Sequence, residues 1–499
     1  MRFALAVLVV FLSVADSAAA RECDLERSSA LDRHAIHIDS DGTGMCRDAA
    51  DELITDKDKF REHARWMLGQ IRARAEAHPQ DRTRILLYVH GALNVLDESS
   101  ENARELARAI AADPNESTRT YPVSINWNAS LPSAYWDHLL YTRQGKQVGL
   151  WRGIWTAPFV AAEDVFGVLG AAPRSWLYQV TIPGGARTGI GSARAVQQRH
   201  REWRERYVAS PGDTLRIATQ PDEQDVSQGR DSTWLRSAWQ IPLAIVSTPV
   251  RLVIGPIVTS FGESAWTNFQ RRTFNMFRRP RDLSNPRPGE DEVQSGALAV
   301  FVDLLIEELG GSGSREERFE RIRERYEIVL IGHSTGAIVL NSLVALYPDL
   351  PYSRIVYMAP ACSIQGALTS VIPYLASNPE SRFSVLTLAF ESERLEQSCF
   401  GLCSDGSLLE WIDAYFSSPV QELDRVLGKW ENAVRYASVF PRRVRPQITL
   451  KKFGWRQPGV PQTHGAFNDY PSEPSRGGFW SDAFGNVQDP SAVAAQAME

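Results

Sequence analysis

The sequence predicts an α/β fold in which a mostly parallel central sheet is flanked by helices and interrupted by a large helical cap insertion. Three observations support this prediction. Short, apolar, β-rich runs alternate with helix-forming stretches in two separate parts of the chain. A long aromatic-rich stretch between the two parts lacks that alternation. A glycine-flanked serine lies at the junction of one β-rich run and the helix-forming stretch after it.

The N-terminus has the three parts of a secretory signal peptide. Met1-Arg2 is a positive start, Phe3 to Val14 is almost wholly apolar, and Ala18-Ala19-Ala20 provides a small-residue cleavage site. The alternative is a membrane anchor, but the apolar run is shorter than the ~20 residues that span a bilayer. We therefore expect cleavage before Arg21 and a secreted or periplasmic protein.

Composition and cysteine spacing limit the classes of function. The 499 residues carry a net charge of −6 without a dominant basic stripe, which argues against a nucleic-acid partner. Export permits disulfides, and the sequence-local pairs are Cys23 with Cys46 and Cys399 with Cys403, leaving Cys362 over. The spacing of the cysteines does not match a structural zinc site. The sequence also lacks a phosphate-binding loop, so we expect no nucleotide cofactor.

The predicted elements follow in chain order. A helix is expected within a polar N-terminal segment, and a strand, helix and strand come next. After the insertion, a strand precedes a helix, and three further strands follow. The predicted ranges are 58–77 (helix), 84–89 (strand), 98–112 (helix), 121–127 (strand), 326–331 (strand), 337–347 (helix), 353–358 (strand), 383–390 (strand) and 448–453 (strand).

These elements divide the chain into six parts. They are a signal peptide (1–20), an N-terminal segment (21–82), a first core part (83–127), a cap or lid insertion (128–325), a second core part (326–470) and a C-terminal tail (471–499).

The most apolar piece of the insertion is Ile241 to Phe261. Three prolines and Arg251 interrupt it, which disfavours a transmembrane helix. Two interpretations remain, a buried core of the cap and an interfacial element that contacts a membrane surface.

The strongest motif is Gly332-His333-Ser334-Thr335-Gly336, which has the form G-x-S-x-G. It lies directly between a predicted strand and a predicted helix, and this context gives the pattern its meaning as a nucleophile elbow. Such a sharp turn exposes a serine hydroxyl above the sheet and places it at a helix N-terminus, which favours developing negative charge. The motif predicts Ser334 as a nucleophile, while His333 is expected to have a structural role.

A serine nucleophile needs a base, and His464 is the only histidine that follows the motif. It lies in a loop after the last predicted strand. The acid that orients it should follow the strand 383–390, where Glu391, Glu393, Glu396 and Asp405 all qualify. We favour Glu393, with Glu391 second.

An oxyanion hole needs two backbone N–H groups. One is expected at Thr335, directly after the nucleophile. The other is expected at Ala92, in the loop after the strand 84–89, where Gly91 lets the backbone approach a substrate.

Together these residues resemble the α/β-hydrolase superfamily, in its esterase and lipase branch, over about 84–127 and 326–467. The resemblance implies a serine hydrolase that cleaves carboxylic esters, lipid esters included, through an acyl-enzyme without a cofactor. The single glycine of the loop at Gly91 differs from the HGGG form of that family, so substrate preference does not transfer. The alternatives are an acyltransferase, an amidase or peptidase on the same site, or an inactive hydrolase-like binding protein. The sequence does not indicate the oligomeric state.

Overall fold

The structure is a computed structural model that describes residues 22–92, 96–114, 116–143, 146–147, 150–181, 216–219, 259–279, 295–396, 406–417, 421–435, 437–454 and 460–468. The expected signal peptide, the tail 471–499, Cys399, Cys403 and most of the apolar piece 241–261 lie outside these residues.

The fold is built on a ten-stranded sheet in the order β3-β2-β1-β5-β4-β9-β10-β11-β12-β8. All neighbours from β1 to β8 in this order are parallel, and β2 and β3 add an antiparallel edge. The predicted α/β fold with a mostly parallel sheet is therefore confirmed. The strands are β1 (Ala35–Ile38), β2 (Gly44–Arg47), β3 (Leu53–Thr55), β4 (Thr83–Val89), β5 (Thr120–Trp127), β8 (Arg216–Thr219), β9 (Tyr326–His333), β10 (Tyr352–Met358), β11 (Arg382–Thr387) and β12 (Ile448–Lys452).

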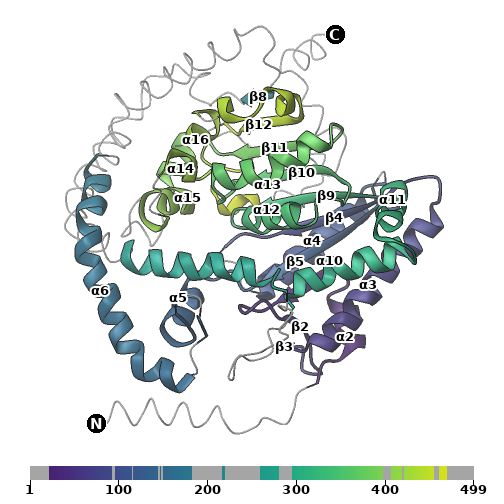
Figure 1. The fold of residues 1–499 in the computed structure, drawn as a ribbon, viewed down its shortest axis with the longest axis horizontal. Helices are drawn as coiled ribbons and strands as arrows, with labels where there is room; N and C mark the ends of the chain where they lie inside the picture. Colours follow the sequence, from purple (N-terminus) through teal and green to yellow (C-terminus); the bar gives the residue numbers. More distant parts are fainter. Residues whose placement is uncertain are drawn as a thin grey trace.

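The central strands β4, β5 and β9 are buried along their whole length. A parallel sheet covered on both faces requires this, which is why these strands are continuous apolar runs rather than alternating ones. Helices α12 (Gly336–Leu346) and α13 (Ile364–Ser377) pack together over β9 and β11 (Figure 1). Elsewhere α3 (Lys57–Ala77) packs against α10 (Ala297–Gly310), which contacts α11 (Arg315–Arg325).

Several elements were not predicted. The polar N-terminal segment supplies the edge strands β1, β2 and β3, and β8 adds to the opposite edge through its pairing with β12. Within the stretch 128–325, α10 and the helical residues 259–275 contribute buried side chains to the same hydrophobic core as the sheet. That stretch is therefore not wholly separate from the core.

Two further helices of that stretch, α5 (Leu131–Leu140) and α6 (Leu150–Thr181), lie beside the sheet at the edge of the molecule (Figure 1). The two pack against each other. Among the residues that the structure describes, no helix is both long and apolar enough to cross a membrane.

The strand order places a topological switch point between β4 and β9. The chain leaves β4 for β5 on one side and later forms β9 on the other side of β4. Val89 and Gly332 are register partners at the carboxyl ends of these two strands. In open α/β sheets, ligands bind in the crevice at such a point, so the loops after β4 and β9 are the first place to look for a site.

For the cysteines that the structure describes, the pairing predicted from their positions in the sequence is confirmed. Cys23 and Cys46 form a disulfide with their Cα atoms 5.8 Å apart, which ties the N-terminus of the described chain to β2. Cys362 is free and buried.

Candidate active site

Ser334 lies at the turn between β9 and α12. Its φ of +51° is in the left-handed region, which is costly for a residue with a side chain. A Cβ on Gly332 would lie 2.8 Å from Leu340 Cδ1, and one on Gly336 would lie 2.2 Å from the Val89 carbonyl oxygen. The two glycines of the motif are therefore needed for the close packing of this turn, as the sequence predicted for a nucleophile elbow.

Hydrogen bonds from the neighbouring strand hold the strained turn. The N–H of Ser334 donates to the carbonyl of Met358 over 2.9 Å, and the N–H of Ala361 donates to the carbonyl of Ser334 over 2.8 Å. Both the N–H and the carbonyl of Ser334 are therefore hydrogen-bonded to β10 and the residues after it. These bonds fix the backbone from which the serine hydroxyl projects.

His464 meets this hydroxyl. The distance between Ser334 Oγ and His464 Nε2 is 2.8 Å, and both side chains are buried, with 0% and 6% of their surface exposed. Burial, and secondarily the nearby His333, lowers the pKa of His464 well below its ordinary value. A neutral imidazole accepts the serine proton at Nε2 and therefore carries its own hydrogen on Nδ1. The structure thus brings together the predicted nucleophile and base.

His333 positions the loop that carries this base. Its Nε2 donates to the carbonyl of His464 over 3.1 Å, and its ring packs against those of His464 and Phe467. Burial lowers the pKa of His333 to about 4, so it is a neutral donor at ordinary pH. These contacts are of the kind expected for a structural His333, and they are made with His464, the predicted base.

The loop after β4 approaches the serine from the other side. A Cβ on Gly91 would lie 2.6 Å from Ser334 Cβ, so only glycine fits at this position. His90 anchors the loop because its Nδ1 donates to the Gly91 carbonyl over 2.8 Å while its Nε2 accepts the N–H of Trp127 over 3.1 Å. No role was predicted for His90 from the sequence. Its position directly after a predicted strand was the one feature that could have indicated a role in this loop.

The expected oxyanion donors lie in these two loops. Thr335 is the N-cap of α12, where a backbone N–H has no partner within the helix. Ala92 follows Gly91 directly and is buried. Both residues therefore flank the serine, and their role as donors stays a prediction.

Glu393, the favoured candidate for the acid, makes no hydrogen bond to His464. Glu393, on α14 (Phe390–Leu395), is fully buried, and its Oε2 accepts a hydrogen bond from the Ser407 hydroxyl. Its Oε1 has no hydrogen-bond partner, and neither does His464 Nδ1. The expected hydrogen bond between Glu393 and His464 is therefore not present. Glu391 lies on the same helix, and its side chain is outside the described part of the chain.

The surroundings of Glu393 raise the pKa of its carboxyl group. Burial raises its pKa well above the ordinary value, and the nearby Glu396, Glu410 and Glu431 raise it further, while the Ser407 hydroxyl opposes the shift. The neighbouring cation Lys429 lies 3.0 Å from Glu410 and 3.5 Å from Glu431. Burial and the surrounding carboxylates therefore disfavour the charged form of Glu393.

Glu396 is the carboxylate that contacts the base residue. Its Oε2 accepts the backbone N–H of His464 over 2.9 Å. Burial raises the pKa of Glu396, and the hydrogen bond from His464 opposes that rise. Sequence analysis named Glu396 among four qualifying residues, but nothing in the spacing distinguished it.

A cavity of about 330 Å³ lies between α12, α13 and the helical residues 259–275, and neither Ser334 nor His464 is among its lining residues. Ala361, whose N–H binds the Ser334 carbonyl, is part of its wall. The wall also includes Trp266, Phe274 and Asn341. The described residues contain no group of three or more His, Cys, Asp or Glu side chains that could hold a metal ion.

Comparisons of the chain with protein-family models, with curated proteins and with solved structures found no match.

Proposed function

We propose that this protein is a serine hydrolase that cleaves carboxylic esters through an acyl-enzyme on Ser334, and that it has an α/β-hydrolase fold. The observation that carries the proposal is the 2.8 Å contact between Ser334 Oγ and His464 Nε2, made at a left-handed strand-to-helix turn. A positioned base within hydrogen-bonding distance is what turns a weak serine nucleophile into a reactive one.

In the proposed reaction, Ser334 Oγ attacks the ester carbonyl carbon while His464 Nε2 takes the hydroxyl proton. The carbonyl oxygen becomes an oxyanion, which the N–H groups of Thr335 and Ala92 stabilise. The bond between carbon and the alcohol oxygen then breaks, and His464 gives its proton to the leaving alcohol. Water repeats the sequence on the acyl-enzyme and releases the acid and free Ser334.

We propose Glu396 as the carboxylate that orients His464, in place of the predicted Glu393. When Nε2 accepts the serine proton, Nδ1 carries a buried hydrogen without an acceptor, and such a group costs about 1–3 kcal/mol. Glu396 is the described carboxylate that is hydrogen-bonded to the backbone of the same residue, which makes it the candidate for that acceptor.

The disulfide between Cys23 and Cys46 supports the proposal that the protein is exported. Disulfides persist in oxidising compartments and are rare in the cytosol. An exported location also agrees with the signal peptide that the sequence predicts at residues 1–20.

The test uses a fluorophosphonate probe and p-nitrophenyl esters of increasing chain length on the mature protein. We expect wild type to be labelled and active, and Ser334→Ala to lose labelling and at least ~10⁴-fold in kcat. Ser353→Ala, which removes a hydroxyl from β10 away from the turn, is the matched control and should behave like wild type.

Other outcomes separate the alternative functions. Labelling without ester hydrolysis, together with transfer of the acyl group to an added alcohol or cleavage of an amide, would indicate an acyltransferase or an amidase on the same site. If wild type is neither labelled nor active, the serine hydrolase proposal is wrong, and the inactive binding protein becomes the favoured alternative.

A further inference from the structure

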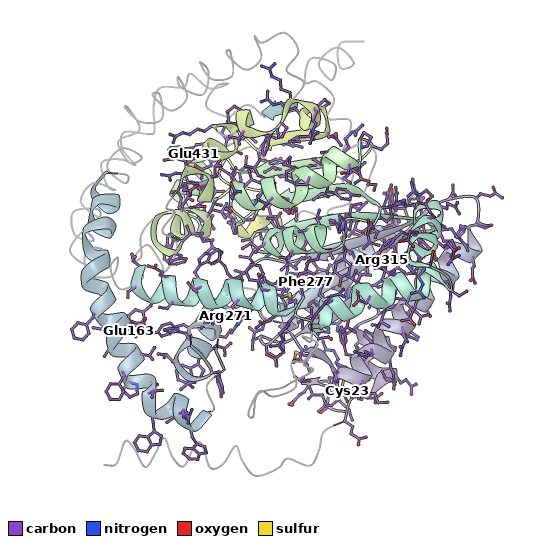
Figure 2. The ribbon with its side chains drawn as sticks, in the orientation of Figure 1. Cys23, Glu163, Arg271, Phe277, Arg315 and Glu431 are labelled. Carbon is purple, nitrogen blue, oxygen red and sulfur yellow. A yellow bond between two sulfur atoms is a disulfide. The ribbon has the colours of Figure 1, made fainter. Side chains whose placement is uncertain are left out.

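Helix α6 exposes apolar side chains to solvent, which is the reverse of the usual arrangement for a helix on a protein surface. Among its described large apolar side chains, the most exposed are Trp151, Trp155, Phe159 and Phe166, with 75%, 75%, 76% and 73% of their surface exposed. Such a helix normally turns its apolar residues to the core and its polar residues to water. In Figure 2, aromatic side chains along α6 point away from the rest of the molecule.

The exposed apolar residues form one continuous face. At about 100° per residue, the four aromatic residues fall within an arc of about 80° of the helix circumference. Ile154 and Val165 are also exposed and widen this arc to about 140°. We call these six residues the aromatic face of α6. Arg152 and Glu163 lie outside the arc at its border, and the positions inside it carry no charge.

The opposite side of α6 is fixed to the protein by polar groups. Asp164 is buried and accepts hydrogen bonds from Tyr135 and Ser264, each over 2.9 Å. Gly153 packs so tightly that an added Cβ would lie 1.9 Å from the Leu140 carbonyl oxygen. The aromatic face is therefore held outward by specific contacts on the inner side of the helix.

We infer that the aromatic face of α6 docks on the surface of a lipid bilayer, with the helix lying parallel to the membrane. The inference goes beyond the proposed ester hydrolysis and does not depend on it. Trp and Phe on one face of a helix are the side chains that enter the boundary between headgroups and acyl chains. Because the face is uncharged, it suits neutral headgroups, and the net charge of −6 gives anionic lipids no advantage.

Size and shape favour lipid over a second protein. The four aromatic rings expose on the order of 600 Å² in total. This lies at the upper end of the ~300–600 Å² of the largest apolar patch on a typical monomer, and the rings alone fall short of the ~800 Å² per partner of a stable protein interface. The face is also a convex ridge on a single helix. A fluid bilayer closes around such a ridge, whereas a protein partner would need a matching groove.

The experiment is flotation of the mature protein with uncharged phosphatidylcholine vesicles. We expect wild type to bind, with its tryptophan emission shifted to shorter wavelength, and the binding to persist in high salt. Replacing Trp151, Trp155, Phe159 and Phe166 together by Ser should weaken binding at least about tenfold. Leu346→Ser, which removes another exposed apolar side chain outside α6, is the matched control and should bind like wild type.

Each other result overturns the inference. Absence of wild-type binding, or equal binding by the fourfold variant, excludes α6 as the docking surface. Binding that requires anionic lipid and disappears in salt would be driven by charge instead. If wild type self-associates in sedimentation without lipid and the fourfold variant does not, the occupant is a second copy of the chain. The vesicle assay measures binding alone and does not depend on ester hydrolysis. Circular dichroism of each variant confirms that it is folded.

Discussion

The imidazole Nε2 of His464 lies 2.8 Å from Oγ of Ser334, although 130 residues separate the two in the chain. The serine is held by β9 and α12, and the histidine loop by contacts with His333 and Glu396. The predictions below test whether this contact is the centre of a catalytic site and what maintains it.

Glu396→Gln should lower kcat for a soluble ester by about 10²- to 10⁴-fold with little change in KM, because His464 then lacks a carboxylate to stabilise its imidazolium. Glu393→Gln is the matched control. Glutamine resembles a protonated carboxyl and keeps the contact with Ser407, so its kcat should stay within about threefold of wild type. The reverse pattern would restore Glu393 as the acid.

The acid limb of the pH profile should lie below pH 6.5. Burial lowers the pKa of His464 below the ordinary value of 6.5, so the base is neutral at pH 6.5 and is lost only as the pH falls through the lowered pKa. The measurement is kcat/KM for a neutral ester between pH 4 and pH 9. A midpoint near or above pH 7 would contradict a buried, neutral base.

Gly91→Ala should abolish most activity while the protein still folds. The new Cβ would lie 2.6 Å from Ser334 Cβ and force the loop away from the serine, so we expect a loss of about 10²- to 10³-fold in kcat. Gly69→Ala on α3 is the control, because no atom lies within 4 Å of an added Cβ there. Full activity in Gly91→Ala would show that this loop takes no part.

Arg84→Met should destabilise the sheet next to the site. Arg84 on β4 is buried between Glu116, at 2.7 Å, and Glu327 on β9. Its loss takes the buried cation away from both carboxylates, and Glu327 keeps only the pairing with Arg119 at 3.2 Å. Such a change costs about 3–5 kcal/mol in the free energy of unfolding.

Chemical denaturation measures the cost at Arg84, and Arg108→Met is the control. Arg108 is exposed and pairs with Glu101 on the surface, where a loss of at most about 1 kcal/mol is expected. Equal destabilisation by the two variants would show that the buried network is not needed.

Reduction of the disulfide between Cys23 and Cys46 should lower the free energy of unfolding by about 3 kcal/mol. The bond closes a loop with a sequence separation of 23, and most of its effect comes from restricting the unfolded chain. Cys23→Ser should match the reduced wild type in thermal unfolding, and added reductant should leave the variant unchanged. Wild-type unfolding that is insensitive to reductant would contradict this.

The sequence alone predicted the strands β4, β5, β9, β10, β11 and β12, the helices that follow β4 and β9, the sharp turn at Ser334, and His464 as the candidate base. These depend on local signals, namely apolar runs, a glycine-flanked serine and the fact that one histidine follows it. Tertiary structure decided which carboxylate meets His464, because Glu391, Glu393 and Glu396 are close in sequence and only the path of the histidine loop distinguishes them. It also decided the edge strands such as β8, whose four residues pair with β12, far away in the chain. The outward direction of the aromatic face of α6 came from the contacts of Asp164 and Gly153 on its other side. The physical reason is the same in each case. A local sequence pattern indicates which secondary structure a segment can form. Which distant segment it pairs with depends on packing and hydrogen bonds between residues far apart in the chain.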